Sequence, residues 1–282
     1  MTDTARLQSC LAACRRIRRD ILEMTHSTGG TGAHLGGSLS MVELLGALYV
    51  GALRFDPKNP VWEGRDRVIL SKGHAALALY PALAEAGIIE RDALATFKQD
   101  GSRLGGHPSL NGLPGIEFAS GSLGQGLSIG VGVCLALRRK GNGDSRAFVF
   151  LGDGECDEGS VWEAAASAAH FRLDQLVAVV DVNAIQYDGY TRDVMDMAPF
   201  EAKWRDFGWN AMSCDGHDTE ALKDAFAWAR KNEGSGKPSV ILAHTVKGKG
   251  VSFMENNILW HYRTPQGEEY EAALKELEAQ RP

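Results

Sequence analysis

The chain has 282 residues, of which 44% are hydrophobic and 23% are charged, and its formal net charge is -6 at pH 7. This is the composition of an ordinary globular protein, and the length allows one large α/β domain or two small ones. The negative charge argues against nucleic acid or an anionic membrane as the main partner. Because no apolar run is long enough to span a membrane and the N-terminus lacks the apolar core of a secretory signal, we expect a cytoplasmic protein.

Two helices with a glycine-rich loop between them are expected at the start of the chain. Residues 3–24 carry apolar side chains at helical spacing, which predicts an amphipathic helix whose basic side chains face solvent or a partner chain. These basic side chains are Arg15, Arg16, Arg18 and Arg19. The loop over residues 29–38 contains His34, and a second helix is predicted over residues 40–52.

A short strand over residues 66–71 is expected next, and it runs directly into Lys72-Gly73-His74 and a helix over residues 75–86. A long loop containing His107 follows. It leads to a glycine cluster over residues 121–126, which begins a helix predicted to end at residue 139. Since the first N–H groups of a helix have no partner within it, this helix start can bind an anion.

The centre of the chain has the pattern of a strand, a helix and a second strand. The apolar run that begins at Phe148 ends in Gly152-Asp153-Gly154, which predicts a strand that breaks into a tight turn. A helix over residues 160–171 and a buried strand over residues 176–181 follow. If the two strands are parallel neighbours, about 5 Å apart, their carboxyl ends lie side by side and Asp153 meets Asn183.

Asp153 and Asn183 would offer a carboxylate, an amide oxygen and nearby backbone carbonyls. These hard oxygen ligands suit Mg²⁺ or Ca²⁺ and suit zinc or copper poorly. An ion at this edge of an α/β sheet commonly bridges to a phosphate group. Gly-Asp-Gly alone is more often only a turn, but its pairing with an asparagine across one strand–helix–strand unit favours a metal site.

The rest of the chain continues the same pattern. Strands are predicted over residues 209–214 and 239–245 with a helix over residues 219–231 between them, and an acidic helix over Gln266 to Gln280 ends the chain. The expected fold class is α/β, with a doubly wound, mainly parallel sheet and helices on both faces. We expect one domain over residues 1–282, with a helical segment at its N-terminus and a short helix at its C-terminus.

Four of the eight histidines lie in loops or at the starts of helices; they are His34, His74, His107 and His261. In an α/β sheet such positions gather at the carboxyl edge of the strands, where ligands bind. Each alone is most simply structural. Together they predict a polar pocket that binds hydroxyl groups and transfers protons. Their wide spacing in the sequence does not favour a zinc site.

The order of these motifs resembles that of transketolases, in which Gly-Asp-Gly followed about thirty residues later by Asn is the thiamine diphosphate signature. The matching segments cover nearly the whole chain: Ala33–Ser38, Ser71–His74, Gly106–Pro108, Gly121–Gly126, Gly152–Gly159, Asp181–Ile185 and Lys247–Val251. Transketolases are usually more than twice as long as this chain. The resemblance therefore implies the pyrophosphate-binding domain alone, as in the N-terminal subunit of a split transketolase.

The resemblance also implies roles for individual residues. Mg²⁺ or Ca²⁺ would be held by Asp153, Asn183 and the carbonyl of Ile185. The residues implied in cofactor binding are His74, Gly121, Ser122, Leu123, Gly152, Asp153, Gly154, Glu158, Asn183, Ile185 and His261. The residues implied in catalysis are His34, His74, His107, His261 and Glu158, with Glu158 facing a partner chain. Ala33 stands where many relatives have glycine, a mild departure in the first loop.

The implied reaction is the transfer of a two-carbon ketol unit from a ketose phosphate to an aldose, with thiamine diphosphate as the electron sink. In this family, activation of the cofactor requires a glutamate of the pyrimidine-binding domain, which this chain lacks. We therefore expect the chain to be inactive alone and to share its site with a C-terminal transketolase subunit, in an α₂β₂ assembly that acts on sugar phosphates.

Other interpretations of the sequence stay open. A fragment of a deoxyxylulose phosphate synthase and the α subunit of a 2-oxo acid dehydrogenase carry a similar metal motif. The histidine set and Lys247-Gly248-Lys249-Gly250 favour transketolase over both. A non-catalytic scaffold that only binds the cofactor is a further alternative, and the presence of Asp153, Asn183 and all four histidines speaks against it.

Overall fold

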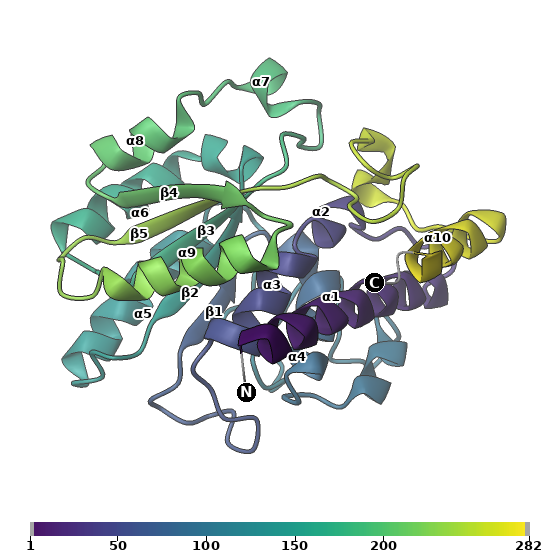
Figure 1. Cartoon of the computed structure of the whole chain (residues 1–282), viewed down its shortest axis with the longest axis horizontal. Helices are drawn as coiled ribbons and strands as arrows, with labels where there is room; N and C mark the ends of the chain where they lie inside the picture. Colours follow the sequence, from purple (N-terminus) through teal and green to yellow (C-terminus); the bar gives the residue numbers. More distant parts are fainter. Residues whose placement is uncertain (1–2, 280–282) are drawn as a thin grey trace.

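The computed structural model describes residues 3–279, and within them five strands form one parallel sheet (Figure 1). The order of the strands across the sheet is β1-β2-β3-β5-β4. The strands are β1 (Arg67–Leu70), β2 (Ala147–Gly152), β3 (Leu176–Val182), β4 (Asn210–Asp215) and β5 (Ser239–His244). The α-helices are α1 (Asp3–Ser27), α2 (Gly36–Leu39), α3 (Val42–Ala47), α4 (Ala76–Glu85), α5 (Gly126–Arg139), α6 (Gly159–His170), α7 (Thr191–Val194), α8 (Phe200–Asp206), α9 (Thr219–Lys231) and α10 (Glu268–Ala279). Shorter helical segments are η1 (Leu48–Ala52), η2 (Gly73–Ala75), η3 (Arg91–Thr96), η4 (Gly154–Asp157) and η5 (Ile258–Tyr262).

Helices cover both faces of the sheet, as the sequence predicts (Figure 1). Phe148 and Phe150 of β2 pack into the core beneath α1, α3, α4 and α9. The alternate residues Val149 and Leu151 pack into a second core with α5, α6 and α8. Successive side chains of a strand point to opposite faces, so a strand covered on both sides reads as an unbroken apolar run. The α/β class, with a parallel sheet between two helical layers, is confirmed.

The central unit β2–α6–β3 places two predicted ligands at one edge of the sheet. Strands β2 and β3 are parallel neighbours, and Gly152 lies opposite Asp181 in their register. Asp153 and Asn183 each lie one or two residues beyond that pair, so both are at the carboxyl edge. The predicted convergence of the two residues is therefore a consequence of the strand register.

The helix predicted over residues 40–52 is different in the structure. The chain is already helical at α2, turns at Ser40 and Met41, and continues through α3 into the π-helical segment η1. Ser40 interrupts the regular helix because its hydroxyl donates to the Asp181 carboxylate at 2.6 Å, and its Oγ also lies 3.2 Å from the carbonyl oxygen of Gly37. A polar contact to the sheet thus replaces a regular helical turn.

Helix α1 corrects one expectation about its basic face. Arg15, Arg16 and Arg19 are exposed, but Arg18 is buried and pairs with Glu43 of α3 at 2.6 Å. Arg18 also donates to the carbonyl of Lys249 at 3.1 Å, so it fixes a loop near the sheet edge. Within the described part of the chain, no helix combines the length and apolar character needed to cross a bilayer.

Other differences from the predicted elements are small. The strand predicted over residues 209–214 is shifted by one residue from β4, and the strand predicted over residues 239–245 is one residue longer than β5. The acidic C-terminal helix is present as α10, while its predicted end at Gln280 lies outside the described residues.

Candidate active site

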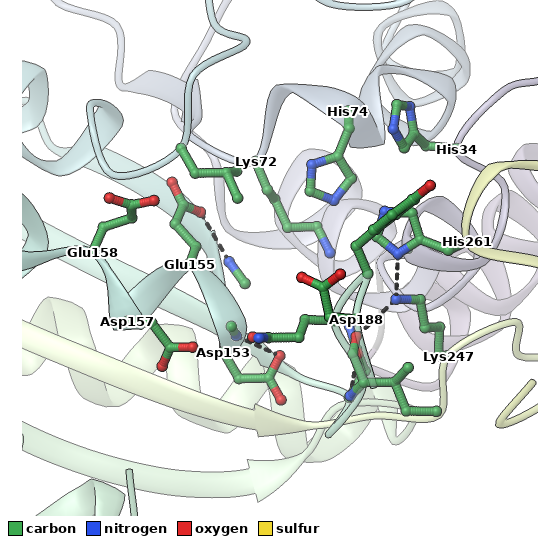
Figure 2. Close-up of a pocket in the computed structure, with 18 of the residues that line it drawn as sticks. His34, Lys72, His74, Asp153, Glu155, Asp157, Glu158, Asp188, Lys247 and His261 are labelled. Carbon is green, nitrogen blue, oxygen red and sulfur yellow. Dashed lines mark hydrogen bonds between the residues drawn. The ribbon is translucent and has the colours of Figure 1, made fainter. Parts of the chain in front are cut away.

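A cavity of about 430 Å³ opens at the carboxyl edge of the sheet (Figure 2). Nearly all predicted site residues line it: His34, His74, His107, Gly121, Leu123, Gly152, Asp153, Gly154, Glu158, Asn183, Ile185 and His261. Ser122 is the exception, since it is exposed and is not part of the lining. Residues that are far apart in the sequence are therefore brought into one space, as predicted.

The predicted metal ligands lie at the floor of the cavity. The buried Asp153 carboxylate accepts hydrogen bonds from the backbone N–H of Gly154 at 2.9 Å and of Ala184 at 2.6 Å. Burial and the nearby Asp181 carboxylate raise the pKa of Asp153 to about 6. Asn183 is also buried, and its Oδ1 accepts the N–H of Ile185 at 3.1 Å. The oxygens of these residues are thus held in place by the backbone around them.

A fully buried ion pair supports this floor. Asp181 of β3 accepts from the ammonium of Lys72 at 2.5 Å and from the side-chain amide of Asn183 at 2.9 Å. Ser40 and Thr245 donate to the same carboxylate. Although burial opposes ionisation, Lys72 and the hydroxyl donors hold the pKa of Asp181 below its usual value. The amide of Asn183 is thereby oriented with its nitrogen toward Asp181, and its oxygen, which accepts the N–H of Ile185, keeps a second lone pair for another ligand.

Glu155 organises the turns on the other side of Asp153. Its buried carboxylate accepts from Ser71 Oγ at 2.5 Å and from the backbone N–H groups of Gly124 at 2.9 Å and Gly152 at 3.1 Å. Ser71 in turn accepts the N–H of Gly126 at 3.0 Å. A side chain at Gly126 would meet Ser71 Cβ at 2.4 Å, so glycine is required where α5 approaches the end of β1.

The four predicted histidines form one cluster, and Figure 2 shows three of them, His34, His74 and His261, on one wall of the cavity. The centre of the His34 ring lies 5.2 Å from His74, 5.6 Å from His107 and 5.5 Å from His261. Burial is the main cause that lowers the pKa of each, to about 4 for His34 and about 3 for His261. The cluster is therefore neutral at neutral pH, and each ring can both donate and accept a hydrogen bond.

Lys247 connects the floor of the cavity to the histidines. Its buried ammonium donates to the carbonyl of Ile185 at 2.7 Å and lies 2.8 Å from Nδ1 of His261 (Figure 2). Burial and the Lys72 ammonium lower the pKa of Lys247 to about 8. The cavity thus contains a cation close to a carbonyl that the sequence predicts as a metal ligand.

Glu158 lies at the rim of the cavity, apart from the histidines (Figure 2). It is exposed, and its Cβ is close to Gly124, where a side chain would meet it at 2.8 Å. The predicted contact of Glu158 with a partner chain stays a prediction.

The residues present fit a divalent ion and a diphosphate. The floor offers carboxylate, amide and carbonyl oxygens, the donor set that Mg²⁺ and Ca²⁺ prefer. Among the side chains that the structure describes, no group of three or more His, Cys, Asp or Glu residues could hold a metal alone, so a site here needs oxygens from the backbone and from a bound phosphate. A side chain at Gly154 would meet Gln186 Oε1 at 2.3 Å, so this position beside Asp153 favours glycine.

Comparison with known proteins identifies the family. The profile described as "Transketolase, thiamine diphosphate binding domain" matches residues 8–278. The chain belongs to the transketolase family. Its parallel α/β fold is accordingly the thiamine diphosphate-binding fold of these enzymes, as the resemblance implies.

Two relatives have nearly the same length as this transketolase-family chain. The 6-deoxy-6-sulfo-D-fructose transketolase subunit SqwG of Clostridium sp. is 44% identical over 87% of this chain and 88% of its own length. An apulose-4-phosphate transketolase subunit of Actinobacillus succinogenes is 41% identical over 93% of this chain and 94% of its own length. Both names describe subunits.

Solved transketolases are longer. A Pichia stipitis transketolase structure aligns with a TM-score of 0.88 and 29% identity over 96% of this chain, which spans 41% of that protein. The Leishmania mexicana enzyme, 29% identical, gives a TM-score of 0.86 over 95% of this chain and 41% of its own. The chain therefore spans about two fifths of the solved transketolases.

Four residues with charged side chains have places in the site that the sequence alone does not reveal: Lys72, Glu155, Asp181 and Lys247. Asp181 had a readable signal, since a carboxylate that ends a run of buried β residues needs a partner. Lys72 stands in a motif beside His74, and nothing in the sequence pairs it with a residue more than 100 positions away.

Proposed function

We propose that this chain is the N-terminal subunit of a two-component transketolase. It would bind the diphosphate of thiamine diphosphate through Mg²⁺ or Ca²⁺ and transfer a two-carbon ketol unit from a ketose to an aldose, together with a C-terminal partner subunit. The relatives of equal length that are named as transketolase subunits support this division. An α₂β₂ assembly, phosphorylated sugars and a cytoplasmic location are parts of the same proposal.

One observation carries the proposal: hard oxygen atoms of the kind that suit a divalent ion and four neutral imidazoles line a single cavity. Asp153, Asn183 and the Ile185 carbonyl supply the hard oxygens. The imidazoles lie on the facing wall, where a substrate bound above the floor would meet them. The oxygen ligands alone would fit simple binding of a phosphate, and the imidazoles alone would not indicate ketol transfer. The combination of the two favours ketol transfer.

The residues of this chain would act by binding and proton transfer. When bound, the cofactor supplies the electron sink for cleavage of the bond between two carbons. The neutral rings of His34, His107 and His261 would hold substrate hydroxyls, accepting a proton at one nitrogen and donating one from the other. Lys247 would add a positive charge beside the diphosphate, and Gly154 would let the backbone approach it.

The glutamate that activates the cofactor in this family would come from the partner, with Glu158 at the rim facing it. The transketolase names of the relatives favour this reaction over the deoxyxylulose phosphate synthase and 2-oxo acid dehydrogenase alternatives. The ordered donor set and the imidazole cluster favour an enzyme over a silent scaffold.

The test is an assay of ketol transfer with the purified chain, thiamine diphosphate and Mg²⁺, with and without a candidate C-terminal subunit encoded beside it. A panel of phosphorylated, sulfonated and unmodified ketoses serves as donors. We expect no transfer by the chain alone and transfer with the partner. Full activity of the isolated chain would refute the shared site, and cofactor binding without transfer to any aldose would favour the scaffold.

A further inference from the structure

Lys98 occupies an unusual position close to the histidine cluster. It follows η3 and has a φ of +57°, a backbone conformation that residues other than glycine rarely adopt. Its backbone N–H donates to the carbonyl of Leu104 at 2.8 Å, which holds this conformation. Its ammonium donates to the carbonyl of Gly32 at 2.8 Å. The side chain thus reaches across to the loop that carries His34.

A second, smaller chamber explains where the ammonium lies. This side chamber has a volume of about 190 Å³, and three histidine rings line both it and the main cavity. Lys98 and several apolar and aromatic residues are also part of its lining. The residues that matter here are His34, His74, His107, Phe97, Lys98 and Tyr262. Lys98 is therefore placed behind the imidazoles, on the side away from the metal floor.

No acid neutralises the charge of Lys98 among the side chains that the structure describes. No ion pair joins Lys98 to a carboxylate of residues 8–279, and the Gly32 carbonyl is its hydrogen-bond acceptor. By contrast, the buried Lys72 is paired with Asp181. A half-buried cation without an opposite charge acts over longer distances on groups nearby, because solvent screens it less.

Both neighbouring imidazoles respond to this charge. Burial is the largest cause that lowers the pKa of His107, and Lys98 is the charged group that lowers it further. For the pKa of His34, burial comes first, followed by His107, Lys247 and Lys98. The other rings that face His34 are His74, His261 and Tyr262, and Lys98 and Lys247 are the lysines whose charges lower the pKa of His34.

We propose that Lys98 is a positioning residue for the imidazole cluster, acting on His34 through the Gly32 carbonyl and on both His34 and His107 through its charge. The hydrogen bond fixes the loop before His34, whose own ring makes ring contacts with its neighbours. The charge favours neutral rings, which can accept protons from hydroxyl groups. The role in catalysis rests on the proposed transketolase function, while the effect on the two rings does not.

The first experiment uses the full chain alone and needs no activity. The imidazole ¹³Cε1 signals are followed by NMR between pH 7.5 and 4, with His34 and His107 assigned from His→Gln variants. In Lys98→Met, we expect the titrations of His34 and His107 to move to higher pH, so that more of each ring is protonated at pH 5.5. Lys98→Arg should keep them near wild type because it keeps the charge. Lys58→Met, at an exposed site, is the control.

Unchanged titrations of both rings in Lys98→Met, or equal movement in Lys58→Met, would overturn the proposal. Lys98→Gln covers the case in which Lys98→Met fails to fold, because it keeps an N–H donor and removes only the charge. A circular dichroism melt of each variant identifies loss of the fold. The same titration shift in Lys98→Gln supports the proposal, and its absence contradicts it.

The second experiment measures kcat and KM of the assembled enzyme. Lys98→Met should lower kcat by about tenfold to a hundredfold, since small displacements of catalytic groups have effects of this size. The acid limb of the rate profile should move to higher pH, and Lys98→Arg should restore it. If the proposed function is wrong, wild type has no ketol transfer either, whereas the NMR result stands independently. A normal rate profile in a folded Lys98→Met enzyme would contradict the role of Lys98 in catalysis.

Discussion

The Asp153 carboxylate accepts the backbone N–H of Ala184 at 2.6 Å, and this bond joins the end of β2 to the end of β3. Ala184 has a φ of +62°, so the chain turns sharply just after Asn183 and presents the N–H to Asp153. The oxygens of Asp153, Asn183 and Ile185 are therefore arranged by the fold itself. This preorganisation lowers the entropy cost of binding an ion and its phosphate.

Two glycines of α5 provide a matched pair of stability predictions. Gly126→Ala should destabilise the fold by about 1–3 kcal/mol, because the new methyl group would meet Ser71 Cα at 2.7 Å. Gly132→Ala, in the same helix, has no atom within 4 Å and should stabilise by up to about 1 kcal/mol. Urea denaturation measures both. Equal effects of the two substitutions would show that α5 does not depend on close contact with Ser71.

Acid should destabilise the cofactor-free chain through the histidine cluster. The pKa values of His34 and His261 fall to about 4 and about 3 in the fold, from an ordinary value of 6.5. Between these values the unfolded chain binds more protons, so this stability is present above pH 6.5 and is lost as the pH falls toward 4. Urea denaturation at pH 7, 6 and 5 should show a falling free energy of unfolding.

The titration of Asp153 should change the free energy of unfolding in the opposite direction to that of the histidines. Its pKa is raised to about 6, above the usual 3.8, so its contribution to stability decreases as the pH rises from about 4 to 6. His34→Asn should therefore flatten the pH dependence, and Asp153→Asn should make it steeper. The same slope in both variants would contradict these assignments of the titrating groups.

Lys247 should strengthen binding of the cofactor diphosphate in the assembled enzyme. Lys247→Met removes the cation beside the Ile185 carbonyl and should weaken thiamine diphosphate binding by about tenfold or more, the usual worth of a charged hydrogen bond. Because the pKa of Lys247 is about 8, wild-type affinity should decline above that pH, and the variant should lack this decline. Calorimetry at pH 7 and 9 measures both effects.

Lys249→Met is the control for Lys247. Lys249 is partly exposed and lies 3.4 Å from Glu255, outside the main cavity. The Lys249→Met enzyme should bind the cofactor as wild type does. An equal loss of cofactor affinity in Lys249→Met would mean that the total charge of the loop determines this affinity, and not the Lys247 ammonium in the cavity.

Asp153 and Asn183 could be brought together from the sequence because strand periodicity and the parallel crossover rule fix where neighbouring strands end. The four histidines could be grouped by the same rule, since each is predicted in a loop or at the start of a helix, positions that gather at the carboxyl edge of an α/β sheet. What the rule does not give is the side-chain partner. The pairing of Lys72 with Asp181 depends on the register of β1, β2 and β3 and on burial, neither of which local pattern encodes.

The break in the helix predicted over residues 40–52 has the same cause. Ser40 is compatible with a helix locally, and only its contact with Asp181 explains the turn there. Arg18 is a similar case, because helical spacing alone cannot separate a solvated arginine from one paired with Glu43. Local propensity predicted the elements, and long-range ion pairs and hydrogen bonds determined these exceptions.

The metal site that we propose at the ends of β2 and β3 is tested by the affinity of the assembled enzyme for thiamine diphosphate. Calorimetry measures this affinity with and without Mg²⁺ in wild type and in Asp153→Ala. Asp157→Asn, from the same turn, is the control. We predict Mg²⁺-dependent binding in wild type and Asp157→Asn, and a loss of about a hundredfold or more in Asp153→Ala. Unchanged, Mg²⁺-dependent affinity in Asp153→Ala would contradict a metal site held by this carboxylate.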